Sequence, residues 1–313
     1  MVRYHPSMAS PAPTILFSSA AFFGRPLAST FDAAAEAGYS GIEVMVMKDP
    51  DSQDPHRMQR LAADSGLTVG ALHAPCLLLT RRVWGTDPIR KIYRSIEVAQ
   101  EAGIPLVVVH PPYRWQYEYR GWLEDRLAGL EERTGVTVAL ENMFPVGRTQ
   151  ERSGFLLHSN ADIHELDGLE HLVLDTSHAA VARHELVALR RSFGPRLRHV
   201  HLSDNAGRGW DSHLPPGEGV LPLEGFLSDL AASGYAGAVS LEVDLRRYLP
   251  DRTALRNIMV QMRERSEAAL HVPGTATDDP VPDAPVAANY RGSQGLIAKR
   301  SASGSSSQPS TSA

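Results

Sequence analysis

Cysteine is almost absent from this chain of 313 residues, which contains a single one. A disulfide scaffold and a cysteine-based zinc ribbon both need several cysteines, so both classes are excluded. A chain so poor in thiols suits a reducing compartment, and we expect a cytoplasmic protein. Thirteen histidines stand beside the one cysteine. Any metal ion must therefore be held by imidazole and carboxylate groups rather than by thiolates.

Long hydrophobic runs are also missing. The apolar run from Ile15 to Phe23 is far shorter than the roughly 18 residues of a membrane span. Arg3 precedes this run, and Gly24-Arg25-Pro26 follows it in place of a small-residue cleavage site, so we expect no signal peptide. The sequence predicts no membrane association.

An excess of positive charge is lacking too. The chain has 31 Lys and Arg against 36 Asp and Glu, a net charge of −5. Since Arg3 adds one positive charge and the charges beyond residue 270 cancel, residues 14–270 carry −6. A protein that holds DNA or anionic membranes through bulk charge would be basic. The composition therefore argues against bulk affinity for nucleic acid.

The two ends of the chain differ in composition from the middle. Residues 1–13 contain three prolines and no apolar periodicity, and residues 271–313 are rich in Pro, Ala, Gly, Ser and Thr. Such segments bury too little apolar surface to offset the entropy lost on ordering. We expect disordered extensions at 1–13 and 271–313 around one folded domain, residues 14–270.

Within the predicted domain, short apolar or β-branched runs alternate with longer amphipathic stretches, several of which end in glycine as helices often do. Eight strands, each followed by a helix, predict an α/β fold, a single (β/α)₈ TIM barrel. The fifth crossover is the weakest, with a short helix near 160–166, and a last helix covers 251–270. An open doubly wound sheet is the alternative, but the first strand is followed by SSAAFFG rather than by a Gly-rich phosphate turn. The predicted strands are 14–18, 41–46, 69–73, 106–110, 137–141, 172–175, 198–202 and 238–242.

Six side chains of metal-binding types stand at or next to the ends of six predicted strands. In a TIM barrel the carboxyl ends of the strands converge on one face, where the active site is built. Unpaired carboxylates buried in a ring would repel one another, so they need a cation. The sequence therefore predicts a metal centre formed by His73, His110, Glu141, Asp175, His201 and Glu242.

Two local motifs extend this centre. LVLDTSH places Asp175 and His178 three residues apart across a strand-to-loop turn. WDSHLPPGEG places Asp211 and His213 two apart in an extended loop, where alternate side chains project the same way. Each pair can reach a single metal site.

Further candidates lie inside the barrel and beside the centre. Glu43 and His199 point inward by the strand period of two and are expected to line the core or contact substrate. The loop RWQYEYRGW, residues 114–122, offers Arg114 and Trp115 as substrate contacts. Arginine with aromatic rings can stack on nucleobases, and sugar pockets use the same residues. A lid or a contact in a homo-oligomer is a further role for this loop.

Seven short motifs follow one another as ALHAP, VVVHPP, ALEN, LDTSH, HVHLSDN, DSHLPPGEG and SLEV. In this order they resemble the xylose isomerase-like TIM-barrel superfamily. That superfamily contains sugar and sugar phosphate isomerases and epimerases together with endonuclease IV, of AP endonuclease family 2. The resemblance covers residues 14–270 and implies the same barrel with a metal site.

The resemblance implies two alternative ligand sets. In the isomerase branch one divalent ion (Mn, Mg, Co or Zn) has four ligands, and the two glutamates among them act as the acid–base pair. In the endonuclease branch nine ligands hold three zinc ions, and this chain has a matching residue for each. The isomerase set is Glu141, Asp175, His201 and Glu242. The endonuclease sets are His73, His110 and Glu141, then Glu141, Asp175, His201 and Glu242, then His178, Asp211 and His213.

The chain departs from the endonuclease pattern where that branch would contact DNA. MFPVGR follows Glu141 and Asn142 in place of a Gly-rich stretch, Ser177 stands where the nuclease pattern has cysteine, and HLSDN replaces HLND. The segment from HLPPGEG to SLE is instead typical of the sugar isomerase and epimerase members. These departures leave the metal ligands intact.

Three functions are considered for these residues. In a metal-dependent sugar isomerase or epimerase, Glu141 and Glu242 exchange protons on the two faces of an enediolate while His178 orients a small sugar-like substrate. In a zinc phosphodiesterase, metal-activated water cleaves DNA at abasic sites, and only here is DNA a partner. A barrel that merely binds a small ligand would lack the paired glutamates. The acidic body and the altered loops favour the isomerase or epimerase.

Overall fold

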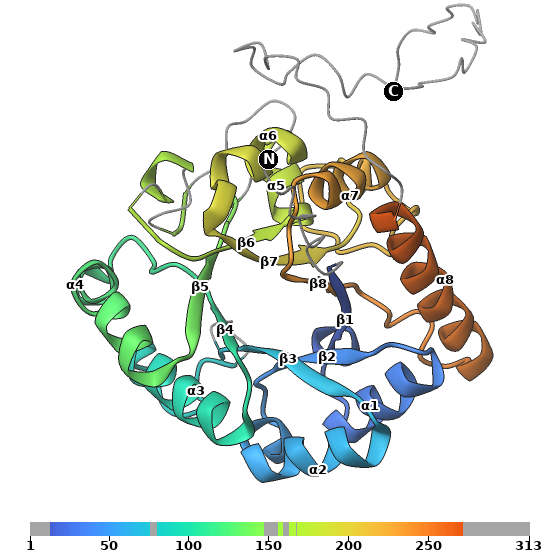
Figure 1. The fold of residues 1–313 in the computed structure, drawn as a ribbon, viewed down its shortest axis with the longest axis horizontal. Helices are drawn as coiled ribbons and strands as arrows, with labels where there is room; N and C mark the ends of the chain where they lie inside the picture. Colours follow the sequence, from blue (N-terminus) through green and yellow to red (C-terminus); the bar gives the residue numbers. More distant parts are fainter. Residues whose placement is uncertain (1–12, 76–79, 147–155, 159–162, 167, 272–313) are drawn as a thin grey trace, which may run out of the picture.

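The computed structural model describes residues 13–75, 80–146, 156–158, 163–166 and 168–271. Eight parallel strands pair in sequence order, and β8 pairs with β1, so the sheet closes on itself (Figure 1). The predicted TIM barrel is therefore confirmed. The strands are β1 (Thr14–Ser18), β2 (Gly41–Met45), β3 (Thr68–His73), β4 (Leu106–Val109), β5 (Thr137–Glu141), β6 (Leu172–Asp175), β7 (Leu197–Leu202) and β8 (Ala238–Leu241).

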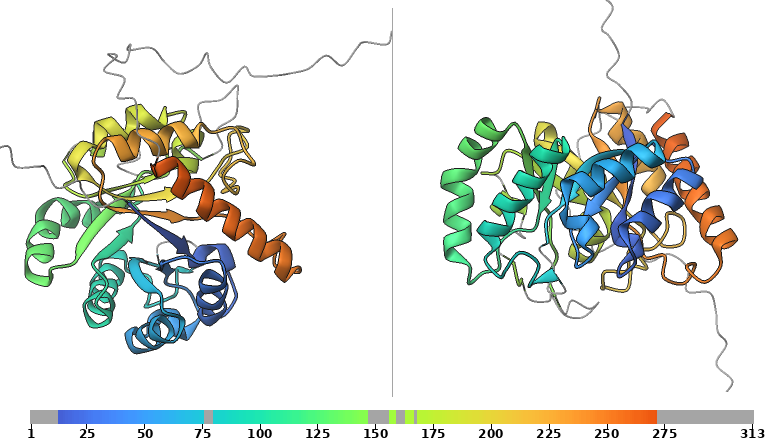
Figure 2. Two further views of the ribbon diagram at one scale, coloured as in Figure 1. Left: turned by 45° about the vertical axis from the view of Figure 1, so that its right-hand side comes forward. Right: turned by 90° about the horizontal axis from the view of Figure 1, so that it is seen from below.

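Helices surround the ring of strands, because each presents an apolar face to the outer side of the sheet (Figures 1 and 2). The last helix packs against the first and against its own predecessor, which closes the outer layer. The helices are α1 (Leu27–Glu36), α2 (Pro55–Ser65), α3 (Pro88–Ala102), α4 (Tyr117–Thr134), α5 (Thr176–Ala182), α6 (Leu186–Phe193), α7 (Leu223–Ala232) and α8 (Arg252–His271).

The expected pattern of one helix after each strand is wrong at β6, which is followed by two. The side chain of Asp175, the last residue of β6, accepts a hydrogen bond from the His178 N–H at 2.6 Å and caps α5. α5 ends at Ala182 and is followed by Arg183, whose φ of 64° is left-handed; Glu185 then caps α6. No Gly or Pro stands between β6 and α5 or between α5 and α6, so the sequence contained no sign that the helix would be interrupted. The described part of the preceding crossover, from β5 to β6, contains only the 3₁₀ turn η4 (Ile163–Leu166).

Some element boundaries differ from the prediction by one residue. β4 ends at Val109 and β8 at Leu241, so His110 and Glu242 are the first residues after their strands. α8 continues through His271, the first residue of the expected tail. The rest of both expected extensions, 1–12 and 272–313, lies outside the described residues. In the described part of the chain no helix has the length and apolar character needed to cross a membrane.

The barrel interior is apolar toward the amino ends of the strands and polar toward their carboxyl ends. Leu16 fills the lower interior, and a Cβ at Gly41 or Gly70 would lie 2.8 Å from one of its methyl carbons. At Gly41 the added atom would also lie 2.9 Å from the backbone carbonyl of Thr68, so this position needs glycine, whereas at Gly70 only the Leu16 side chain would have to shift. Above Leu16 the inner face carries a small apolar cluster, and the polar residues follow at the strand ends. The cluster is Ala71, Leu106, Val108, Ala139 and Val173.

Candidate metal centre

Four side chains at the ends of β5 to β8 form a compact group of ligand atoms, all within 4.8 Å of one another. Nδ1 of His201 lies 3.0 Å from Oε1 of Glu141 and 2.8 Å from Oε2 of Glu242. The same nitrogen is 4.0 Å from Oδ2 of Asp175, its partner in the β6–β7 register. The structure thus brings together four of the residues that the sequence proposed as ligands.

Three buried carboxylate oxygens in this group accept no hydrogen bond of regular geometry from the described residues: Oε2 of Glu141, Oδ2 of Asp175 and Oε2 of Glu242. Imidazole nitrogens lie 3.1 Å from the first and 2.8 Å from the last. Leaving a buried acceptor unsatisfied costs about 1–3 kcal/mol, and more when it is charged. One divalent cation among the three oxygens would satisfy them together. A set of carboxylate and imidazole donors suits Mg, Mn, Co or Zn. The residues present therefore fit a metal ion.

Glu141 also contacts two imidazoles from the strands before it. Nε2 of His110 lies 3.1 Å and Nε2 of His73 lies 3.6 Å from its Oε2. The two rings meet edge to face with centroids 5.1 Å apart. These three residues form a second group of ligand atoms, next to the first and sharing Glu141 with it.

A third group lies on the other side of the centre. Oδ2 of Asp211 is 2.9 Å from Nε2 of His213 and 3.4 Å from Nε2 of His178. Asp175 also forms a compact group of ligand atoms with these two imidazoles. His213 has a φ of 40°, a left-handed conformation that costs about 1–3 kcal/mol and that the surrounding loop must maintain. All nine residues proposed as ligands from the sequence thus lie at one face of the barrel.

Backbone carbonyls orient three of these imidazoles. Nδ1 of His73 donates to the carbonyl of the next residue, Nδ1 of His178 to that of Asn142, and Nδ1 of His213 to that of Glu242, each at 2.9 Å. A neutral histidine that donates from Nδ1 keeps its lone pair on Nε2, as a metal ligand requires. In each case Nε2 faces a carboxylate of the centre.

Burial and neighbouring charges act in opposite directions on these groups. Burial alone lowers the pKa of His201, but the carboxylates of Glu43 and Glu242 raise it well above its usual range. Burial also lowers the pKa of His178, yet Asp175 and other carboxylates raise it to about 10. For Asp175 itself burial dominates and raises the pKa to about 6. Protons on the imidazoles thus balance the carboxylates when no cation does.

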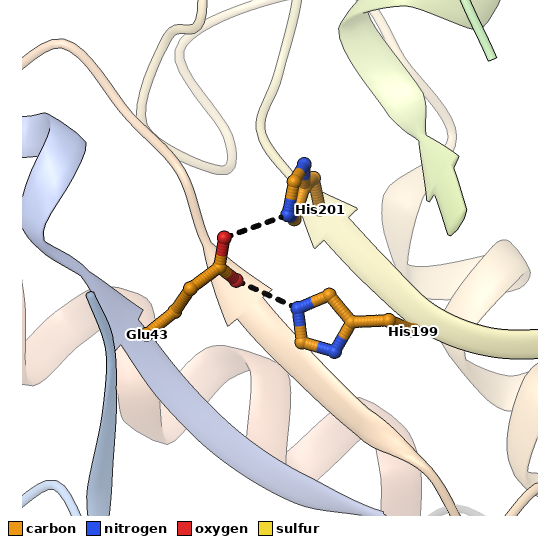
Figure 3. Close-up of side chains that lie close together, drawn as sticks. All are labelled: Glu43, His199 and His201. Carbon is orange, nitrogen blue, oxygen red and sulfur yellow. Dashed lines mark hydrogen bonds and ion pairs between the residues drawn. The ribbon is translucent and has the colours of Figure 1, made fainter. Parts of the chain in front are cut away.

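Glu43 lies on β2, inside the barrel and next to the centre (Figure 3). Its side chain has an exposed fraction of 0%. Its Oε2 is 2.7 Å from Nε2 of His199 and its Oε1 is 3.0 Å from Nε2 of His201. These three residues also form a compact group of ligand atoms, but hydrogen bonds already occupy both oxygens. Glu43 was expected to line the core or to contact substrate, and it lies buried in the barrel, where its carboxylate contacts two imidazoles.

A cavity of about 280 Å³ opens beside His110. Trp115 lines it, is 60% exposed and stacks on Tyr113 with ring centroids 4.8 Å apart. The guanidinium of Arg114 instead lies 3.7 Å from Glu165. Of the two substrate contacts proposed in this loop, Trp115 therefore lines the cavity and Arg114 does not.

His158 lines the same cavity and was not indicated by the sequence. It forms an isolated bridge with Tyr113, stacks on that ring at 4.4 Å and donates from Nδ1 to the carbonyl of Pro111 at 2.8 Å. Burial lowers its pKa to about 4, so the ring is neutral at pH 7. No spacing pointed to it, because it lies within the weakest predicted crossover, between β5 and β6, and meets its partners only after folding.

These features define a class of protein: a (β/α)₈ barrel with a centre of imidazoles and carboxylates at the carboxyl ends of its strands. Residues 31–264 match the family described as xylose isomerase-like TIM barrel, and the chain belongs to this family.

Similar proteins agree with this membership. An uncharacterized protein of Mycobacterium tuberculosis is 38% identical over 250 residues, which are 74% of this chain and 89% of that protein. A solved L-ribulose 3-epimerase superposes with a TM-score of 0.61 at 19% identity, over 86% of this chain and 100% of its own. A D-tagatose 3-epimerase-like protein superposes with a TM-score of 0.58 at 22% identity, over 80% and 99%. These two structures have the same fold.

Proposed function

We propose that the protein is a divalent-metal-dependent isomerase or epimerase of a small sugar, sugar phosphate or related keto-polyol. The observation that carries this proposal is the group of four ligands at the ends of β5 to β8. Both of its glutamates, Glu141 and Glu242, keep a buried oxygen that accepts no hydrogen bond of regular geometry and lies against an imidazole nitrogen. Those oxygens are available to hold a cation or to take up a proton.

The two glutamates supply the acid–base chemistry of the proposed reaction. A divalent cation in the group would polarise a substrate carbonyl and its neighbouring hydroxyl, which acidifies the carbon-bound proton between them. Glu141 and Glu242 face the group from different strands, with Nδ1 of His201 between them at 3.0 and 2.8 Å. One carboxylate removes the proton from carbon and the other returns a proton to the enediolate.

The rest of the substrate has a place beside the centre. The cavity next to His110 is lined by Tyr113 and by Trp115, whose exposed ring offers flat apolar surface to a sugar. His178 is held by the carbonyl of Asn142 and can orient a substrate oxygen. The solved relatives named as L-ribulose and D-tagatose 3-epimerase-like proteins support a ketose as substrate. The single cysteine supports a cytoplasmic location.

A zinc-dependent phosphodiesterase acting on abasic DNA is the second candidate. It is favoured by the two further groups of ligand atoms around His73 and His213, which a one-metal isomerase does not need. Against it stands the net charge of −6 in residues 14–270, because enzymes that track DNA carry a basic stripe.

Metal content and substrate exchange decide between the two candidates. The purified protein is analysed for metal, then incubated in D₂O with a panel of ketoses, and in parallel with a duplex that contains one abasic site. We expect one divalent ion per chain and solvent deuterium at the carbon beside the ketose carbonyl. About three zinc ions per chain with cleavage of the duplex would overturn the proposal.

A further inference from the structure

We propose that Glu43 is a positioning residue for the metal centre: it holds the Nε2 proton of His201, so that the Nδ1 lone pair faces the cation. This inference rests on the metal centre of the proposed function and adds a residue that touches neither the substrate nor the ion. Figure 3 shows the arrangement, with Glu43 reaching from β2 to the two imidazoles of β7.

His201 differs from the other imidazoles of the centre in what holds it. His73, His178 and His213 each donate from Nδ1 to a backbone carbonyl. These carbonyls belong to residues that follow a strand, beyond the regular ladder. His201 lies within β7, and its ring points into the closed barrel, where the strand carbonyls are committed to the ladder. An imidazole at this depth needs an acceptor from a side chain.

Glu43 supplies that acceptor. Its Oε1 lies 3.0 Å from Nε2 of His201, and the opposite nitrogen of the ring faces Glu141 and Glu242. With the proton on Nε2, the lone pair on Nδ1 points to the group of carboxylate oxygens that would hold the cation. A carboxylate acceptor also makes the imidazole a better electron donor to a metal than a neutral acceptor would.

His199 fixes the carboxylate in turn. Its Nε2 lies 2.7 Å from Oε2 of Glu43, and its ring stands at 90° to that of His201 with centroids 5.2 Å apart. Both oxygens of Glu43 are thus engaged, which leaves the side chain one orientation. The pairing of Ser18 with Glu43 across β1 and β2 keeps the carboxylate at this level of the barrel.

The test measures zinc affinity, which does not depend on the substrate. Zn²⁺ is titrated into the metal-free full chain in competition with a chromophoric chelator, and the variant Glu43→Gln is compared with wild type. The amide keeps the size of the side chain but lacks its charge and its second acceptor oxygen. We expect the Kd for Zn²⁺ to rise about 10- to 100-fold, as for other groups that orient metal ligands. A Kd within twofold of wild type would overturn the inference.

Two matched variants separate positioning from general damage. Glu131→Gln makes the same change in another carboxylate–imidazole pair, which belongs to none of the groups of ligand atoms. Oε1 of Glu131 lies 2.7 Å from Nδ1 of His171 and also accepts the Val138 N–H at 2.6 Å. We expect its Kd to stay within twofold of wild type. His199→Leu leaves Glu43 with His201 as its partner, and we expect a smaller loss than for Glu43→Gln. Equal losses in all three variants would show that any disturbance of a buried pair weakens the centre.

A measurement on the wild-type protein stands even if Glu43→Gln does not fold. In ¹H–¹⁵N spectra of the imidazoles in the zinc-loaded protein, we expect His201 to carry its proton on Nε2, with slow exchange against water. A proton on Nδ1 would overturn the inference. If the wild-type protein binds no divalent metal, the proposed function is wrong. If the wild type binds metal and Glu43→Gln has the same Kd, only the inference about Glu43 is wrong.

Discussion

Glu141 is the residue at which the imidazoles of the centre meet. His73 and His110 approach its Oε2, while His178 and His201 approach its Oε1 at 3.3 and 3.0 Å. Burial alone raises the pKa of Glu141, but these imidazoles hold it well below its usual range. The carboxylate is therefore ionised at neutral pH, as both a ligand and a base must be.

Glu141→Gln and Glu242→Gln test the acid–base pair. Each change keeps the size of the side chain and removes the group that carries a proton, so we expect turnover to fall about 10²- to 10⁴-fold. Deuterium incorporation into the active ketose measures it. Glu224→Gln, on an exposed side chain paired with Arg265, serves as the control and should retain full activity. Wild-type rates in both glutamate variants would contradict the assignment.

Metal binding should release protons at pH 7. In the metal-free protein the pKa of His178 is raised to about 10 and that of His201 well above its usual range, so both rings are protonated. A cation takes the lone pair that the proton occupied. We expect at least one proton released per Zn²⁺ bound, measured by calorimetry in buffers of different ionisation enthalpy, with less release as the pH approaches 10. Heats at pH 7 that do not depend on the buffer would contradict this.

At the scale of single elements, α5 joins the architecture to the site. Asp175 ends β6, caps α5 through the His178 N–H, and offers its other oxygen to the centre. One residue therefore performs a structural task with Oδ1 and a chemical one with Oδ2. The two tasks can be separated, because asparagine caps a helix about as well as aspartate does.

The variants Asp175→Asn and Asp175→Ala distinguish the capping of α5 from the binding of the cation. In urea unfolding of the metal-free protein we expect Asp175→Ala to lose about 0.5–2 kcal/mol, the usual cost of a lost cap, and Asp175→Asn to lose much less. Both variants should bind Zn²⁺ more weakly, since neither has the carboxylate. Equal stability losses in the two variants would show that the charge, not the cap, stabilises α5.

The elements themselves were largely predictable from the sequence, and their exceptions have local causes. Short β-branched runs such as residues 106–109 read as buried parallel strands because both faces of such strands are covered. The break between α5 and α6 was not predictable, since Arg183 takes a left-handed conformation that the sequence does not favour. The β5–β6 crossover carries little periodicity, so His158 could not be placed from it.

At the scale of the whole molecule, closure of the barrel explains which site residues the sequence could indicate. Any residue at the carboxyl end of a strand reaches the same face, so His73 and Glu242 could be placed together although 169 positions separate them in the chain. The contact of Glu43 with His201 depends on the depth and tilt of β2 and β7 inside the barrel. Strand periodicity gives the direction of a side chain and not its partner, so that contact required the structure.

The stability of the metal-free protein should depend on pH. The pKa of His178 is about 10 in the folded protein, against about 6.5 for an unperturbed histidine in the unfolded chain. A raised pKa stabilises the fold fully below about pH 6.5, and this contribution is lost as the pH rises toward 10. We expect the Tm of the metal-free protein to fall between pH 7 and pH 9. Saturating Zn²⁺ should reduce the fall, because the cation then balances the carboxylates, and an unchanged slope would contradict this.

Leu16, packed against Gly41 and Gly70, fills the barrel interior at the end opposite the centre. Glu43 therefore lies between apolar side chains on one side and the ligands of the centre on the other. The strands supply Asp175 and His201, whereas Asp211 and His213 come from the loop between β7 and α7. A change in that loop would therefore alter metal binding by a route separate from the one through Glu43.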